Sequence, residues 1–121
     1  MSERALAMFM VISLTVASGF ADAQGFVHAA NMWRDSHLVG RELAKSGVGF
    51  GLGIVSYWIA LRFLDMVGAP SPVVQTTMWF ALTIAGVAII SGDFFRWQMI
   101  DQAVAIAVLG GIGLLFVRGL A

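Results

Sequence analysis

The sequence predicts an all-α membrane protein: a cleavable signal or first transmembrane helix, an amphipathic segment, then three transmembrane helices ending in a helical hairpin. Of its 121 residues, 60% are hydrophobic and 12% are charged, whereas soluble domains have about 25% charged residues. The mean hydropathy is +0.89. The apolar runs are continuous rather than alternating, which indicates helices and not the strands of a membrane barrel.

Charge and cysteine content exclude several classes of function. The formal net charge is zero, whereas nucleic-acid binding depends on clustered Lys and Arg that neutralise phosphates. The chain has no cysteine, so disulfides, thiolate metal sites and cysteine nucleophiles are ruled out. A chain of 121 residues has room for one domain.

Residues 1–23 have the three parts of a secretory signal peptide. A short polar start precedes an apolar stretch, and Ala21-Asp22-Ala23 before Gln24 is a small-x-small site of the kind that signal peptidase accepts. Glu3 offsets Arg4, so the start carries little net positive charge. We expect cleavage after Ala23, and the alternative is an uncleaved first transmembrane helix.

Residues 24–46 form the longest polar segment. Trp33 and Leu38 alternate irregularly with charged residues such as Arg34, Arg41 and Glu42, which is an imperfect amphipathic pattern. The pattern fits an interfacial helix with Trp33 at headgroup depth. It fits a loosely ordered periplasmic arm equally well.

Residues 47–121 are expected to hold three transmembrane helices, of which the first is residues 47–67. Its 21 residues can cross a hydrocarbon core of about 30 Å. Arg62 and Asp65 lie three residues apart near its end and form a candidate ion pair. Alternating glycines near its start make two overlapping small-x-x-x-small pairs that let helices approach closely, so we expect helix packing at Gly47, Gly49, Gly51 and Gly53.

The C-terminal part is expected to be a hairpin of two spans, residues 73–92 and residues 100–117. The connector between them is aromatic, which is typical of the headgroup level of a bilayer, and Arg96 can bind a lipid phosphate. We therefore expect lipid contact at Phe94, Phe95, Arg96 and Trp97. The last span has a strip of small residues that we expect to pack against another helix: Ala103, Ala107, Gly110 and Gly111.

Candidate catalytic or metal-binding groups are scarce. His28 and His37 are nine residues apart, so they would lie on opposite faces of a helix. Asp65, Asp93 and Asp101 all fall at the ends of the expected spans, which argues against a proton-coupled transporter. The sequence therefore predicts no enzyme, no metal site and no cofactor, apart from a bound phospholipid.

Three stretches of the sequence carry a resemblance to a known family. Ala21-Asp22-Ala23, the sequence IISGDFFR at residues 89–96 and the small-residue helix at residues 103–113 resemble pilin-type or small inner-membrane subunits of conjugative and type IV secretion systems. The resemblance implies helical subunits held in the inner membrane and then polymerised with phospholipid into a filament, with Arg96 facing the headgroups. The chain departs from this pattern in having three expected mature spans rather than two, and in balancing Arg96 with Asp93.

The sequence therefore predicts a non-enzymatic membrane subunit that acts through helix packing. Its partners would be membrane lipids and either copies of itself or a larger membrane complex. We expect it in a bacterial inner membrane, or in an extracellular filament if it is a pilin. The alternatives are a phage holin-type pore former and an accessory subunit of a respiratory or photosynthetic membrane complex.

Overall fold

The chain folds into four main helices and one short β-hairpin. The computed structural model describes residues 2–68 and 71–119. In chain order the elements are α1 (Glu3–Ala30), β1 (Trp33–Arg34), β2 (His37–Leu38), α2 (Gly40–Met66), α3 (Pro72–Ile90), α4 (Asp93–Arg96) and α5 (Met99–Gly119).

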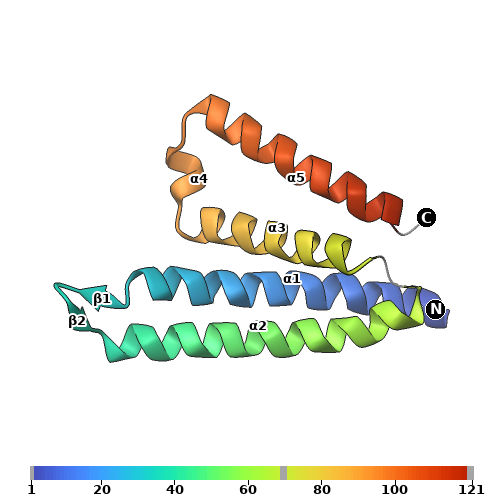
Figure 1. Ribbon diagram of the computed structural model, residues 1–121, viewed down its shortest axis with the longest axis horizontal. Helices are drawn as coiled ribbons and strands as arrows, with labels where there is room; N and C mark the ends of the chain where they lie inside the picture. The colour runs from blue at the N-terminus through green and yellow to red at the C-terminus, as the bar shows by residue number, and fades with distance from the viewer. Residues whose placement is uncertain (1, 69–70, 120–121) are drawn as a thin grey trace.

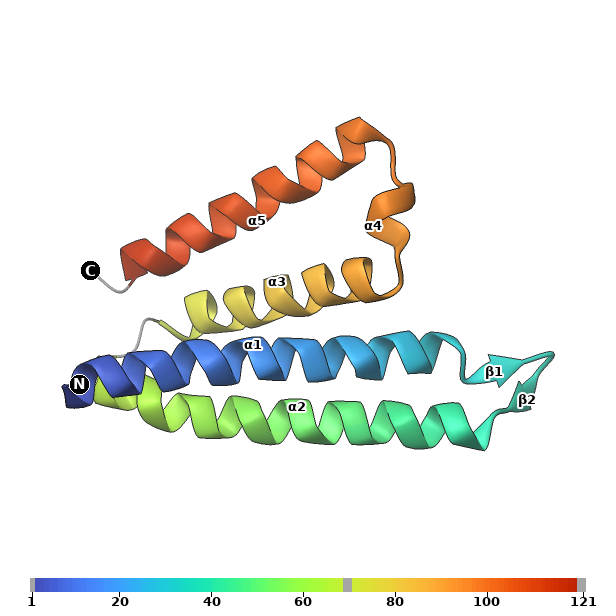
Figure 2. The same cartoon turned by 180° about the vertical axis from the view of Figure 1, so that it is seen from behind.

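Helix α1 is the centre of the fold. Helices α1 and α2 lie antiparallel along their whole length, and α3 packs on α1 (Figure 1). Helix α5 touches α3 and then diverges from it, as the reverse view also shows (Figure 2). One end of the molecule, the hairpin end, holds β1, β2 and α4. The other, the terminal end, holds both chain termini.

The β-hairpin reverses the chain between α1 and α2. Trp33 pairs with Leu38 and Arg34 with His37, in antiparallel register. The two residues of the turn, Asp35 and Ser36, both have positive φ, at 51° and 64°. Two consecutive residues of this kind make the tight turn whose twist matches that of paired strands.

Residues 24–46 therefore form neither one separate helix nor a loosely ordered arm. Their place at the membrane interface stays a prediction. Residues 24–30 are the last turns of α1, the β-hairpin follows, and residues 40–46 are the first turns of α2. The prediction ended the membrane helices at the charged residues of this segment. Helix α2 has 27 residues and is therefore about 40 Å long. It can extend beyond a hydrocarbon core of about 30 Å and carry charges in water.

Within residues 2–68 and 71–119, three helices are long and apolar enough to cross a membrane: α1, α2 and α5. The expected first span lies within α2, a helix that begins at Gly40, earlier than the predicted span, and ends at Met66. The expected second span is α3, which starts at Pro72, and its apolar part Gln75–Ile90 is shorter than the other three. The expected third span is α5. Helix α1 is thus a candidate span, whereas α3, which packs against α1, is one of the shorter apolar helices.

The predicted cleavage site lies inside α1. Helix α1 runs without a break through Ala21-Asp22-Ala23, and Ala23 is fully buried. In the intact chain a peptidase would have to reach a bond that the packed helices cover. Cleavage after Ala23 stays a prediction, and this packing supports the alternative of an uncleaved first transmembrane helix.

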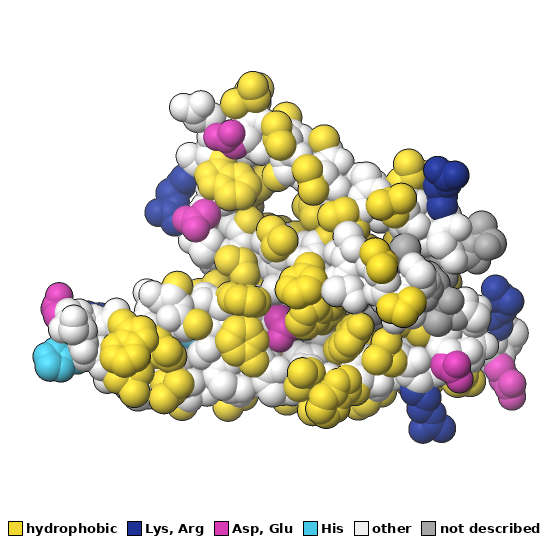
Figure 3. Space-filling model, in the orientation of Figure 1, with side chains coloured by type: hydrophobic (Ala, Val, Ile, Leu, Met, Phe, Trp, Pro, Cys, Tyr) yellow, Lys and Arg dark blue, Asp and Glu magenta, His cyan; other side chains and the backbone are white. Residues whose placement is uncertain are grey.

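The helices are packed closely through small residues, while large apolar side chains point outward. The buried apolar residues include Ala7, Ala23, Ala60 and Ala81. Hydrophobic side chains cover most of the face drawn in Figure 3, with most charges at the two ends. Small residues inside and large apolar residues outside are the arrangement expected when lipid is the solvent.

Candidate functional site

Helices α1, α2 and α3 meet at a group of polar side chains, here called the polar junction. It consists of buried Ser18, Asp22 and Thr83 and half-buried Trp79. Ser18 has no exposed surface, and its Oγ donates a hydrogen bond of 2.6 Å to the carbonyl oxygen of Gly53 on α2. The Trp79 indole Nε1–H on α3 donates to the same Oγ at 2.8 Å. One hydroxyl therefore links all three helices.

Asp22 lies one turn beyond Ser18 on the same face of α1. It is 2% exposed, and its Oδ2 has no hydrogen-bond partner among the described residues. A buried carboxylate without partners is costly in an apolar setting. Buried Asp22, one turn from buried Ser18, is therefore the most unusual chemical feature of the bundle, and it is not among the binding or packing residues that the sequence predicted.

Thr83 completes the junction from α3. It is 2% exposed and its Oγ1 donates to the Trp79 carbonyl oxygen, one turn earlier in the same helix, at 3.0 Å. Such a bond is usual for a threonine inside an apolar helix, because its hydroxyl can bond a carbonyl oxygen of the preceding turn. Its hydroxyl oxygen still has acceptor capacity.

The alternating glycines of α2 divide between two faces. A Cβ added at Gly49 would lie 2.7 Å from the backbone nitrogen of Gly25, and one added at Gly53 would collide with Oδ1 of Asp22. A Cβ at Gly47 or Gly51 would meet nothing within 4 Å. Gly49 and Gly53 therefore lie against α1, whereas Gly47 and Gly51 face away from it, because two residues along a helix turn the side chain by about 200°. Packing of another helix at Gly47 and Gly51 stays a prediction.

A row of polar contacts leads from the junction to the hairpin end. Buried Ser46 donates from Oγ to the carbonyl oxygen of Gly25 at 2.8 Å. Nearer the hairpin, Nδ1 of His28 lies 2.6 Å from Oε2 of Glu42. Both side chains of this pair are about four-fifths buried, at 24% and 18% exposure. His28 is in the last turn of α1 and Glu42 in the first turn of α2, where a carboxylate suits the helix dipole.

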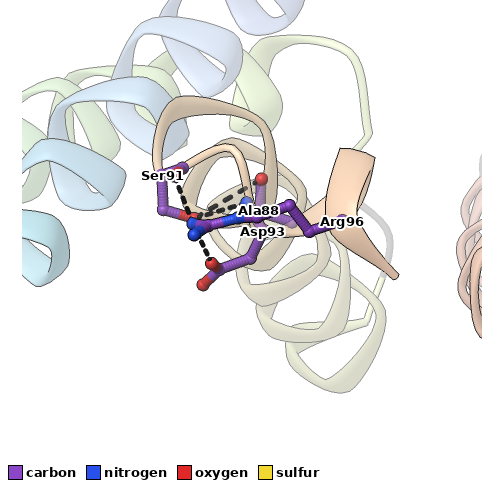
Figure 4. Close-up of polar contacts among 4 residues, drawn as sticks. All are labelled: Ala88, Ser91, Asp93 and Arg96. Carbon is purple, nitrogen blue, oxygen red and sulfur yellow. Dashed lines mark hydrogen bonds and ion pairs between the residues drawn. The ribbon is translucent and has the colours of Figure 1, made fainter. Parts of the chain in front are cut away.

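The aromatic connector forms a small folded cluster around α4. The Phe94 ring packs edge-on against Phe95 and Trp97, with centroids 5.6 and 5.9 Å away. Arg96 Nη2 donates to Asp93 Oδ1 at 2.6 Å and to the Ser91 carbonyl oxygen at 3.2 Å (Figure 4). The ion pair is largely exposed, at 71% and 55%. Lipid contact at Phe94, Phe95, Arg96 and Trp97 stays a prediction, and Arg96 keeps guanidinium donors for a phosphate.

The predicted small-residue strip on α5 faces away from the rest of the chain. Ala103, Ala107, Gly110 and Gly111 are all exposed, and a Cβ added at Gly110 or Gly111 would meet nothing within 4 Å. Within the described residues the strip therefore packs against no other helix.

The candidate pair of Arg62 and Asp65 is not formed. Both residues are exposed at the terminal end of α2, and the ion pairs among described residues are those of His28 with Glu42 and Asp93 with Arg96. Water solvates both charges there, so that pairing them gains little.

Helices α3 and α5 enclose an apolar groove of about 630 Å³. Its walls include Phe80, Ile84 and Ala88 on α3, Trp97 from the connector and Leu109 on α5. The groove results from the divergence of the two helices. The expected C-terminal hairpin is thus antiparallel but open.

The sequence prediction missed the polar junction because Asp22 was assigned to a cleavage motif. Ser18, Asp22 and Gly25 follow the i, i+4, i+7 spacing of one helix face, and that spacing was the available signal. Trp79 could not be linked to them, since 61 residues separate it from Ser18. Among the described residues, groups of three or more His, Asp or Glu that could hold a metal ion are absent.

Replacing Ser18 by alanine should destabilise the bundle by about 1–3 kcal/mol. The Trp79 indole N–H and the Gly53 carbonyl would both lose their shared partner in a buried place. Denaturation of the purified protein in mixed micelles measures the free energy of unfolding. Thr77→Ala is the matched control, because the Thr77 hydroxyl bonds only the nearby Val73 carbonyl in an exposed position, and it should change stability little.

Comparisons with known proteins identify no relative of this chain. No family model matches the chain, and searches of curated proteins and of solved structures return no match.

Proposed function

We propose that this protein is a non-enzymatic membrane subunit that assembles with further copies of itself through α5. The observation that carries the proposal is the outward strip of Ala103, Ala107, Gly110 and Gly111, which the chain's own helices leave uncovered. No residue of α5 within Met99–Gly119 is buried. A helix so apolar, with its small residues on the free side, is suited to association in lipid.

The strip is suited to a second copy in particular. Ala103 with Ala107 and Ala107 with Gly111 are small-x-x-x-small pairs, and copies inserted in one orientation present their α5 helices parallel. Parallel helices with this spacing can approach until their backbones touch. The strip lies on the side of α5 opposite the residues that line the groove, such as Leu109, so assembly leaves the contact with α3 intact.

We further propose that the assembly is an inner-membrane part of a conjugative or type IV secretion apparatus. The resemblance of residues 89–96 and 103–113 to subunits of those systems supports this role. The burial of α1 against α2 and α3 favours a subunit that stays in the membrane over one that is cut, extracted and polymerised. Filaments sheared from the producing cells should therefore lack this protein, and its recovery from them would instead identify a pilin.

Gly111→Ile should weaken self-association at least about tenfold. A branched side chain in the middle of the strip would hold two α5 helices apart, and a loss of about 1.4 kcal/mol corresponds to a factor of ten in the dissociation constant. Energy transfer between donor- and acceptor-labelled copies, measured over a series of protein-to-lipid ratios in vesicles, gives that constant.

The matched control is Gly113→Ile. It introduces the same side chain in the same helix, where a Cβ also meets nothing within 4 Å, but it points about 160° away from Gly111 around the helix and lies at the edge of the strip, about 60° from Gly110. Energy transfer in this variant should therefore fall much less than in Gly111→Ile. Equal association of both variants and the unaltered chain would contradict assembly through this strip.

A further inference from the structure

We propose that Asp22 is a reversible proton-binding site inside the membrane-embedded bundle. The proposal concerns α1, α2 and α3 and does not depend on how copies assemble through α5. It follows from three observations: the distance of Asp22 from charged residues along the helices, its burial without a hydrogen-bond partner at Oδ2, and the small space beside Gly53.

The first step is the isolation of the carboxyl group from charge. Asp22 is the only Asp, Glu, His, Lys or Arg in residues 5–27 of α1, and α3 contains none. On α2 the corresponding stretch, residues 46–61, has Tyr57 as its only titratable side chain, and Tyr57 packs on Trp79 with ring centroids 5.4 Å apart. The titratable groups that come next toward the hairpin end are His28 on α1 and Lys45 and Glu42 on α2.

The second step is burial without a partner. Asp22 is 2% exposed, and its Oδ2 accepts no hydrogen bond within the described chain. Ionised carboxyl groups in such places are paired, and a group that is neither paired nor solvated is held in its neutral form. A proton neutralises the carboxyl group without any further ligand.

The third step is the size of the space around the Asp22 side chain. Gly53 faces Asp22 on α2, and any Cβ there would collide with Oδ1 and lie 2.8 Å from Cγ. The absent side chain makes room for one carboxyl group. A cationic side chain from another subunit cannot reach this place, because the chain's own helices already cover it. Metal ions need several oxygen ligands, whereas the Ser18 hydroxyl is committed to Gly53 and Trp79.

Infrared difference spectroscopy of the full chain in phosphatidylcholine vesicles tests the proposal. At neutral pH the protein should show the carbonyl stretch of an un-ionised carboxylic acid, which should disappear at alkaline pH and return on acidification. The nearly isosteric Asp22→Asn should lose the band. Asp93→Asn is the control, since it removes an exposed, ion-paired carboxylate, and it should keep the band.

Three results would overturn the proposal. The same acid carbonyl band in the unaltered chain and in Asp22→Asn at every pH would mean that the Asp22 carboxyl group never binds a proton. A band that persists unchanged to strongly alkaline pH would mean that the proton is never released. Loss of the band at constant pH when sodium chloride replaces choline chloride would identify a cation site instead.

Discussion

Gly49→Ala should destabilise the bundle by about 1–3 kcal/mol, whereas Gly51→Ala should be neutral or stabilising by up to about 1 kcal/mol. The added methyl at position 49 would lie 2.7 Å from the Gly25 nitrogen and 2.8 Å from the Ala21 carbonyl oxygen. Both are backbone atoms that cannot swing away, so α1 and α2 must separate, and overpacking of this kind costs about 1–3 kcal/mol. At position 51 the methyl meets nothing within 4 Å, and only the better helix propensity of alanine remains.

The two variants form a matched pair, since each adds one methyl to one helix two residues apart. Their difference in unfolding free energy, measured in the same mixed micelles, therefore isolates the contact between α1 and α2. The same comparison for Gly53→Ala should give a loss at least as large, because its Cβ would collide with Asp22. Equal stabilities of the Gly49→Ala and Gly51→Ala proteins would show that α2 does not pack on α1 in this register.

Removal of residues 1–23 should abolish the fixed tertiary structure while leaving most of the helix content. Helices α2 and α3 each pack mainly on α1, so the shortened chain loses the surface that holds them. Trp79 also loses the Ser18 hydroxyl that its indole N–H bonds. Near-ultraviolet circular dichroism, which reports fixed aromatic packing, should be lost, and the far-ultraviolet helical signal should remain.

A complementation experiment controls for simple insolubility of the shortened chain. A separate peptide of residues 1–30, added to the shortened chain in micelles, should restore the near-ultraviolet signal, because membrane helices can form first and associate afterwards. A peptide with Gly19→Leu should restore less, since a Cβ at Gly19 would lie 2.9 Å from the Cβ of Leu82. A shortened chain with full-length packing and cooperative melting would contradict the central place of α1.

The membrane class and the helices at residues 47–117 could be predicted from the sequence because continuous apolar runs determine them. Pro72 at the start of α3 and the local bond of Thr83 were predictable for the same kind of reason, since each depends on neighbours within one turn. The choice between the two glycine faces was not predictable. Gly49 and Gly51 have the same local sequence character, and only the position of α1 decides which face is covered.

The part of the site that could not be predicted depends on contacts between distant segments. Asp22 lies between two alanines, which fits a signal-peptidase site as well as one face of a helix. Its burial results from the packing of Gly53 of α2 against it, and that contact is not visible in the local sequence. In the sequence His28 has no evident partner, whereas in the structure the β-hairpin brings Oε2 of Glu42 within 2.6 Å of its Nδ1. That reversal depends on Asp35 and Ser36 taking positive φ, which their sequence permits but does not demand.

The retention of α1 is the claim on which the polar junction and its proton site both depend, and intact-mass spectrometry of the protein extracted from its own membrane tests it most directly. We expect a mass that includes residues 1–23. A mass that places the N-terminus at Gln24 would mean that Ser18 and Asp22 are absent from the mature protein, and would contradict the account.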